Sequence, residues 1–220
     1  EIDPRPVLKN LAKEYPGTWV YSNNGLIGAT PELLIRLNNS MVVSRVLAGT
    51  ISKTGDDDKD LALAASLARS SKDLEEHEYA VRSVADALAP FCNSTNVPDA
   101  PFVLHLSNVM HLATDVTGAI NEGHKVIDIF TILSKLHPSA AVCGTPTNLA
   151  AKLIGEIEGI NRRRYAGPIG WVDAKGDGEQ GIALRCGFID GKQIQAYAGC
   201  GIVAGSDAAR EVAESQAKFL

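Results

Sequence analysis

The sequence is poor in aromatic residues, has no long apolar run and contains only a few cysteines. Aromatic residues account for 5% of the chain, and no apolar stretch reaches the length that a membrane-spanning helix needs. The cysteines show neither a Cys-x-x-Cys pair nor the spacing of a zinc site; they are Cys92, Cys143, Cys186 and Cys200. We therefore expect reduced thiols in a cytoplasmic protein that has no membrane partner.

An excess of positive charge is also lacking. The chain has 220 residues and a formal net charge of -5, which argues against nucleic acid as a partner. Hydrophobic residues make up 45% of it, which is typical of a globular domain. The chain opens at Glu1 and passes directly into Asp3-Pro4, a helix N-cap followed by proline. This start in mid-pattern leads us to expect that residues 1–220 are the C-terminal part of one larger domain.

Hydrophobic periodicity and turn residues predict a mixed order of helices and strands. Helices are expected over residues 4–14, 59–69, 74–91, 126–135, 147–158 and from about 207 onward. Strands are expected over residues 18–22, 26–29, 33–37, 41–47, 102–106, 109–120, 169–173, 181–189 and 193–203. Tight turns such as Asp190-Gly191 join neighbouring strands, which must then be antiparallel. This order predicts an α+β fold with helices packed on antiparallel β-sheets.

Two motifs resemble ligand loops but fail on their spacing. The run that starts at Asp173 resembles a calcium loop, yet Leu184 stands where a bidentate Glu is needed, so a hairpin turn is expected. The run Gly199-x-Gly201-x-x-Ala204 resembles a dinucleotide fingerprint, but too few residues follow it for a second strand with its acidic residue. Its glycines still allow a ligand to approach the backbone just before a helix N-terminus.

Two expected helices begin with pairs of acids one turn apart. Glu211 and Glu214 lie on one face of the last helix, and Asp73 and Glu76 lie on one face of an earlier helix. Each pair alone is typical of a solvated helix surface. If the two pairs meet, their oxygens form a site suited to Mg²⁺, which takes a few carboxylates plus water and an anionic ligand.

Three further side chains have a chemical interpretation beside a purely structural one. Glu32 follows a strand among apolar residues, as either a turn glutamate or a carboxyl whose raised pKa lets it donate a proton. His111 lies in an apolar strand, where a hydrogen-bonded core histidine is the simpler interpretation. Arg185 is expected inside a strand, where a guanidinium needs a partner such as a ligand carboxylate.

Together these segments resemble the chorismate-binding family, which comprises anthranilate, aminodeoxychorismate, salicylate and isochorismate synthases. Eight motifs follow the family's order across nearly the whole chain. They are Gly28-Ala-Thr-Pro-Glu32, Leu47-Ala-Gly-Thr50, Lys72-Asp73 to His77-Glu78, His111-Leu-Ala-Thr114, His137-Pro138 to Gly144-Thr-Pro146, Gly167 to Trp171, Leu184-Arg-Cys186, and Ala198 to Val203 followed by Glu211-x-x-Glu214-x-x-x-Lys218. The resemblance implies the family's β-sandwich fold, truncated at the N-terminus.

The resemblance also implies a role for each matching residue, with chorismate as the substrate. Glu32 matches the general acid that protonates the departing C4 hydroxyl, and His111 is a second candidate catalytic residue. Glu76, Glu211 and Glu214 match ligands of a Mg²⁺ ion that holds the ring carboxylate. The substrate pocket corresponds to Thr114, Ala141, Gly144, Tyr165, Arg185, Gly199, Gly201 and Lys218.

Particular residues favour the isochorismate synthase branch. Ala48 stands where aminodeoxychorismate synthases carry a nucleophilic lysine, the residues after Glu76-His77 differ from those of anthranilate synthases, and Ala141 keeps the bulk beside the ring small. The implied reaction adds water at C2 of chorismate and expels the C4 hydroxyl. A salicylate or anthranilate synthase, a non-catalytic Mg²⁺- or chorismate-binding relic and an unrelated α+β domain remain alternatives.

One residue of the family pattern is missing. The family's general base is a lysine on a strand upstream of the region that matches Glu32, and Lys9, Lys13 and Lys125 sit in no matching motif. We therefore expect that these 220 residues alone do not turn over chorismate. The sequence leaves open whether the product would feed the synthesis of a siderophore or of a quinone such as menaquinone.

Overall fold

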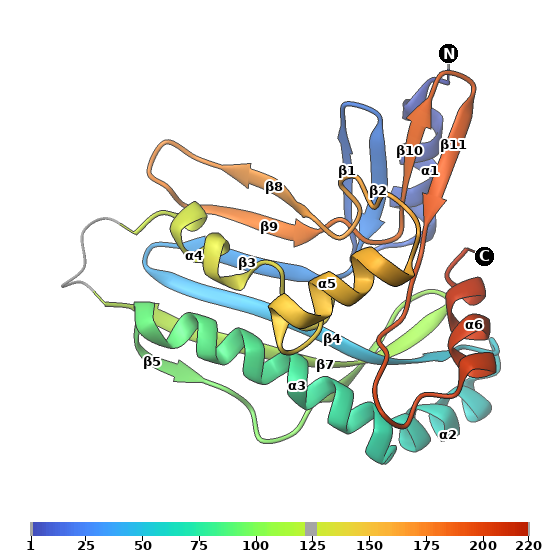
Figure 1. Cartoon of the computed structure of the whole chain (residues 1–220), viewed down its shortest axis with the longest axis horizontal. Helices are drawn as coiled ribbons and strands as arrows, with labels where there is room; N and C mark the ends of the chain where they lie inside the picture. Colours follow the sequence, from blue (N-terminus) through green and yellow to red (C-terminus); the bar gives the residue numbers. More distant parts are fainter. Residues whose placement is uncertain (1, 122–126, 220) are drawn as a thin grey trace.

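A computed structural model describes residues 2–121 and 127–219 and places their strands in two antiparallel β-sheets (Figure 1). Sheet A has the strand order β1-β2-β10-β11, formed by Trp19–Asn23, Leu26–Thr30, Cys186–Asp190 and Gln193–Tyr197. Sheet B has the order β5-β7-β4-β3-β9-β8, and β6 also pairs with β7. Its strands are β3 Leu33–Asn38, β4 Met41–Ser52, β5 Cys92–Asn96, β6 Phe102–His105, β7 Val109–Ile120, β8 Pro168–Val172 and β9 Gly178–Ile182. The predicted α+β class is confirmed.

Most of the helices begin after a residue whose side chain caps them. They are α1 Pro4–Glu14, α2 Asp57–Leu67, α3 Ser71–Leu88, η1 Ala89–Phe91, α4 Ile129–Leu136, α5 Thr147–Ile157 and α6 Ala208–Ala217. The side chain of Asp3 caps α1, Ser70 caps α3 and Asp207 caps α6, each by accepting a backbone N–H of the first turn. None of the helices described here is long and apolar enough to serve as a membrane span.

The main hydrophobic core lies between sheet B and the helices α3 and α4, which run along one face of that sheet (Figure 1). Leu88 of α3, Ile132 of α4 and Val42 of β4 are each fully buried there. A separate cluster on sheet A contains Leu26 and Tyr197. Burial of side chains of this size stabilises the fold by about 1.5–3 kcal/mol each, so the apolar faces of α3 and α4 fix the position of sheet B.

The two sheets are joined twice at one place. The chain passes from β2 into β3 through Pro31 and Glu32, and from β9 into β10 through residues 183–185. Backbone hydrogen bonds hold these two crossings together. The N–H of Ile182 donates to the Glu32 carbonyl at 3.1 Å, and the N–H of Ala29 donates to the Arg185 carbonyl at 3.3 Å. Glu32 and Arg185 are therefore neighbours although they lie far apart in the sequence.

Two glycines permit this close crossing. A Cβ atom at Gly28 would lie 2.9 Å from the Arg185 carbonyl oxygen. A Cβ atom at Gly181 would lie 2.9 Å from the side chain of Thr30 and 3.1 Å from the Glu32 carbonyl oxygen. Contacts this short force a shift of the backbone, so both positions require glycine while the crossings keep their present distance.

The expectation of one strand over residues 181–189 was wrong. The chain forms two strands there, β9 in sheet B and β10 in sheet A, with a break between them. Arg185 lies in that break and not inside a strand, and its φ of +48° puts it in the left-handed region. A non-glycine residue in this region costs about 1–2 kcal/mol, which the hydrogen bonds around the crossing offset.

Other boundaries differ from the expected ones in smaller ways. The strand expected over 193–203 ends at Tyr197, and an additional edge strand, β5, pairs with β7. The helix expected from residue 126 begins at Ile129, and residue 126 itself lies outside the described residues. The run after Asp173 is a hairpin turn between β8 and β9, as predicted.

Replacing Leu88 by Ala should lower the free energy of unfolding by roughly 2–5 kcal/mol, because its side chain is completely buried between α3 and sheet B. Urea denaturation measures this change. Leu61→Ala is the matched control, since Leu61 on α2 is 70% exposed and its truncation should change stability by less than about 0.5 kcal/mol. Equal losses in the two variants would contradict this description of the core.

Candidate functional site

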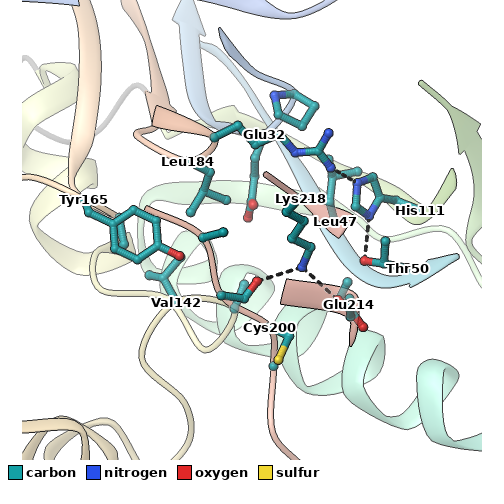
Figure 2. Close-up of a pocket in the computed structure, with 18 of the residues that line it drawn as sticks. Glu32, Leu47, Thr50, His111, Val142, Tyr165, Leu184, Cys200, Glu214 and Lys218 are labelled. Carbon is teal, nitrogen blue, oxygen red and sulfur yellow. Dashed lines mark hydrogen bonds and ion pairs between the residues drawn. The ribbon is translucent and has the colours of Figure 1, made fainter. Parts of the chain in front are cut away.

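A cavity of about 170 Å³ lies where the two sheets meet. Both crossings, β4, β7, α3, α6 and the loop that follows β11 contribute residues to its wall. Most of the predicted site residues line it, namely Glu32, Glu76, His111, Ala141, Tyr165, Arg185, Gly199, Gly201, Glu214 and Lys218. Figure 2 shows the Glu32 carboxyl and the Lys218 ammonium pointing into the same space.

Glu32 occupies the first crossing with its carboxyl group buried. Glu32 is 6% exposed, and its backbone N–H donates to the Thr30 hydroxyl at 3.2 Å. Burial raises the pKa of the carboxyl to about 8, although the positive charges of Lys218 and Arg185 oppose that rise. At neutral pH the side chain therefore carries a proton that it can donate into the cavity.

Arg185 and His111 contact each other at the other side of the crossing (Figure 2). The guanidinium Nη2 of Arg185 lies 2.6 Å from His111 Nε2, and His111 Nδ1 lies 3.1 Å from the Thr50 hydroxyl. Burial, together with the positive charges of Arg185 and Lys218, lowers the pKa of His111 to about 3. His111 is therefore neutral, and the guanidinium keeps its positive charge in a mostly desolvated place.

The acids expected to bind metal meet near α3 and α6, where two of them are paired with lysines. Lys72 Nζ donates to Glu211 at 2.6 Å, and Lys218 Nζ donates to Glu214 at 2.8 Å and to the Gly199 carbonyl at 2.8 Å. Burial raises the pKa of Glu211, but hydrogen bonds led by that of Lys72 outweigh it and hold this pKa below its ordinary value.

Glu76 differs from the other two acids. Within the described ranges, no hydrogen bond or ion pair reaches its carboxylate, which lies against Gly201, where an added Cβ would clash with it. Burial raises its pKa, and the negative charges of Glu214, Asp73 and Glu211 contribute to that rise. The cluster therefore holds negative charge that its lysines do not fully neutralise.

A divalent cation fits this charge pattern, but it must displace a lysine. Among residues 2–121 and 127–219, no group of three or more His, Cys, Asp or Glu side chains stands ready to bind one metal ion together. Glu76 and Glu214 both face the cavity and repel each other electrostatically. A cation between them would relieve that repulsion, and withdrawal of Lys72 would add the Glu211 oxygens.

Three predicted site residues do not line the cavity. Thr114 is buried on β7, where its hydroxyl lies 2.7 Å from Nε2 of His77. Glu211 faces a neighbouring surface hollow on α6 and meets the site through Lys72. Gly144 lies in the loop between α4 and α5, with a φ of +107°. Lys125, which matches no motif, lies outside the described residues.

The cavity wall also contains residues that sequence reasoning missed. Arg162 donates to Glu158 through Nε at 2.7 Å and to the Val142 carbonyl at 2.9 Å, and its guanidinium lies 5.9 Å from the centre of the Tyr165 ring. Tyr165 in turn stacks on Tyr197 with ring centres 5.4 Å apart. Arg162 lies beyond the end of α5 at Ile157, so no helical spacing pointed to its contacts.

Comparison with known proteins agrees with this geometry. A family described as "Chorismate binding enzyme" matches residues 1–220. Isochorismate synthase DhbC of Bacillus subtilis (strain 168) is 39% identical over 194 residues, which are 88% of this chain and 48% of that protein. Isochorismate synthase MenF of the same organism is 35% identical over 222 residues, which are 99% of this chain and 46% of that protein.

A solved structure extends the likeness to three dimensions. The crystal structure of a putative 2,3-dihydroxybenzoate-specific isochorismate synthase, DhbC from Bacillus anthracis, superposes with a TM-score of 0.90 at 36% identity, and the match covers 99% of this chain and 60% of that one. The chain spans about half the length of the curated relatives it matches.

Glu32→Gln should remove a pH dependence of stability. The folded chain raises the pKa of Glu32 from 4.5 to about 8, so it binds this proton more tightly than the unfolded chain does. The stability that this group contributes is complete below about pH 4.5 and falls as pH rises toward 8, by up to about 1.4 kcal/mol per pH unit. Urea denaturation across this range should therefore show a flatter profile for Glu32→Gln. The exposed Glu78→Gln is the control, and a profile identical to the wild type in both variants would contradict the buried proton.

Proposed function

The chain belongs to the family of chorismate binding enzymes, and from this premise we propose that it is the part of an isochorismate synthase that holds chorismate and protonates it. Relatives that match it include isochorismate synthases. The proposed reaction converts chorismate to isochorismate: water adds at C2, the double bonds shift, and the hydroxyl at C4 leaves as water.

The buried proton on Glu32 is the observation that carries this proposal. A leaving hydroxyl needs a proton at the moment its bond to carbon breaks, and an acid with a pKa near neutrality supplies one. The pKa of Glu32 is about 8, and its carboxyl points into the cavity (Figure 2). Since desolvation causes the shift, a substrate that excludes water from the cavity would keep the proton in place.

Two cations in the cavity suit the carboxylates of chorismate. Arg185 contributes a guanidinium that can bind a carboxylate in bidentate fashion, and among the described residues its hydrogen-bond partner is the neutral His111. The Lys218 ammonium stands opposite Glu32, at the end of α6 (Figure 2). Gly199 and Gly201 line the same wall, where their backbone N–H groups would be further donors to a carboxylate.

We assign Mg²⁺ to the acidic side of the cavity, with Glu76, Glu214 and Glu211 as the residues that would hold it. When bound, the ion would neutralise a substrate carboxylate and orient the ring. The raised pKa of Glu76, caused by burial and by the charge of Glu214, supports a cation in this place. The lysine pairs of Glu211 and Glu214 would then stabilise the acids in the metal-free protein.

Ala48 limits the chemistry in a way that suits water as the nucleophile. It lines the cavity on β4, at the position where the similar aminodeoxychorismate synthases carry a nucleophilic lysine. A methyl group there offers no nucleophile and leaves room beside the ring. No residue of this sequence corresponds to the base that activates the water, so we propose that these 220 residues bind chorismate without turning it over.

Calorimetry should detect Mg²⁺ binding that depends on the acids. Glu76→Gln and Glu214→Gln each remove a proposed ligand and should weaken Mg²⁺ binding by at least about tenfold. Lys72→Met should strengthen it by about fivefold, because it releases Glu211 from an ion pair of the kind that is worth up to ~1 kcal/mol.

Glu78 is exposed and lies on α3, as Glu76 does, so it is the matched control. Glu78→Gln should leave Mg²⁺ affinity within a factor of two, by the same calorimetric measurement. Unchanged affinity in Glu76→Gln and Glu214→Gln would place the metal elsewhere and reject this assignment.

Chromatography of the products should separate the alternatives. Purified chain incubated with chorismate and Mg²⁺ should yield no isochorismate, whereas the full-length gene product should yield isochorismate and neither salicylate with pyruvate nor, with ammonia, anthranilate. Turnover by the chain alone would show that it contains its own base. Salicylate or anthranilate from the longer protein would reject the assigned reaction.

A further inference from the structure

His111 is a buried imidazole with both ring nitrogens engaged. Its residue is 6% exposed on β7. Nε2 lies 2.6 Å from the guanidinium of Arg185, and Nδ1 lies 3.1 Å from the hydroxyl of Thr50. Figure 2 shows both contacts as a continuous chain from the guanidinium through the ring to the hydroxyl.

The chemistry of the two partners determines where the ring proton resides. A guanidinium has donors and no acceptor, so Nε2 must be without a proton to accept from Arg185. The single proton of a neutral ring is then on Nδ1, where the Thr50 hydroxyl can accept it. The charged groups that act on the ring are Arg185 and Lys218, both cations, so they oppose a second proton.

Arg185 in turn depends on this acceptor. Its guanidinium is largely buried, and His111 is its hydrogen-bond partner in the described part of the chain. Its backbone is held at a φ of +48° in the break between β9 and β10. An acidic partner would neutralise the guanidinium, whereas a neutral imidazole orients it and leaves its charge available for an anion.

We infer that His111 is a positioning residue, fixed as the Nδ1-protonated neutral tautomer, which orients the Arg185 guanidinium toward a ligand carboxylate and exchanges no proton with the substrate. This inference rests on the proposed function only for the identity of the anion. It replaces the catalytic role that the sequence suggested for His111 with an action through Arg185.

Nitrogen-15 NMR of the imidazole rings tests the tautomer directly. The chain has five histidines, and the signals of His111 are those lost in His111→Gln. We expect a bare Nε2 and a protonated Nδ1 that persist between about pH 5 and pH 8, where an ordinary histidine titrates. A proton on Nε2, or titration within this range, would overturn the inference.

Two substitutions of His111 distinguish a residue that orients Arg185 from one that only fills space. The amide oxygen of Gln reaches about as far as Nε2 and can accept from Arg185, whereas that of Asn stops near the position of Nδ1. Chorismate binding, measured by calorimetry, should stay within about threefold of the wild type in His111→Gln. It should weaken about tenfold in His111→Asn, as in Arg185→Gln.

The double variant and a control complete the test. In Arg185→Gln, the further change His111→Asn should weaken binding by less than about twofold, because the group it orients is gone. His105→Gln, on the exposed side of β6, should leave binding unchanged. Equal losses in His111→Gln and His111→Asn, or full additivity with Arg185→Gln, would overturn the positioning role. If the wild type binds no chorismate, the proposed function fails while the NMR result still decides the tautomer.

Discussion

The chain crosses from sheet A to sheet B at Glu32 and returns from sheet B to sheet A at Arg185, and backbone hydrogen bonds from Ile182 to Glu32 and from Ala29 to Arg185 keep the two crossings together. The crossing places Glu32 and Arg185 in the wall of the cavity. It brings a carboxyl from the first part of the chain next to a guanidinium from the last part, and it does so without a helix or a flexible loop between them. Side chains held by rigid strands are positioned more precisely than side chains on loops. The two sheets therefore fix the positions of Glu32 and Arg185 in the cavity wall.

Burial then sorts the side chains of the cavity into neutral and charged groups. The same loss of solvent raises the pKa of Glu32 and lowers that of His111, so both are uncharged at neutral pH. The Arg185 guanidinium lies beside the neutral His111, whereas Glu76 and Glu214 come from α3 and α6, where the Lys218 ammonium donates to Glu214. Under the proposed function, the carboxylates of the substrate would face Arg185 and Lys218, and its leaving hydroxyl would face Glu32.

The sequence predicted the class of the fold, and most of the site residues that it predicted line the cavity, because motif spacing and hydrophobic periodicity are local signals. It failed where contacts between distant segments override local preference. The break at Arg185 lies in the apolar run Ala183-Leu184-Arg185-Cys186, which contains no glycine or proline, so only the crossing reveals it. Strand β5 is short and polar and is formed by pairing with β7. The Lys72 partner of Glu211 depended on how α3 and α6 approach each other, which no spacing encodes, whereas the pair of Glu214 and Lys218 follows their i,i+4 spacing.

The separation of Glu32 from Arg185 and Lys218 along the chain also has a consequence in time. A ribosome releases Glu32 long before it releases the residues that will cover it, so during synthesis this carboxyl stands in water and is ionised. It takes up its proton only when β10 and α6 arrive and close the cavity. Contacts between segments so distant in sequence form late and slowly. Closure of the cavity is therefore coupled to the uptake of a proton, and an acidic surrounding favours the closed state.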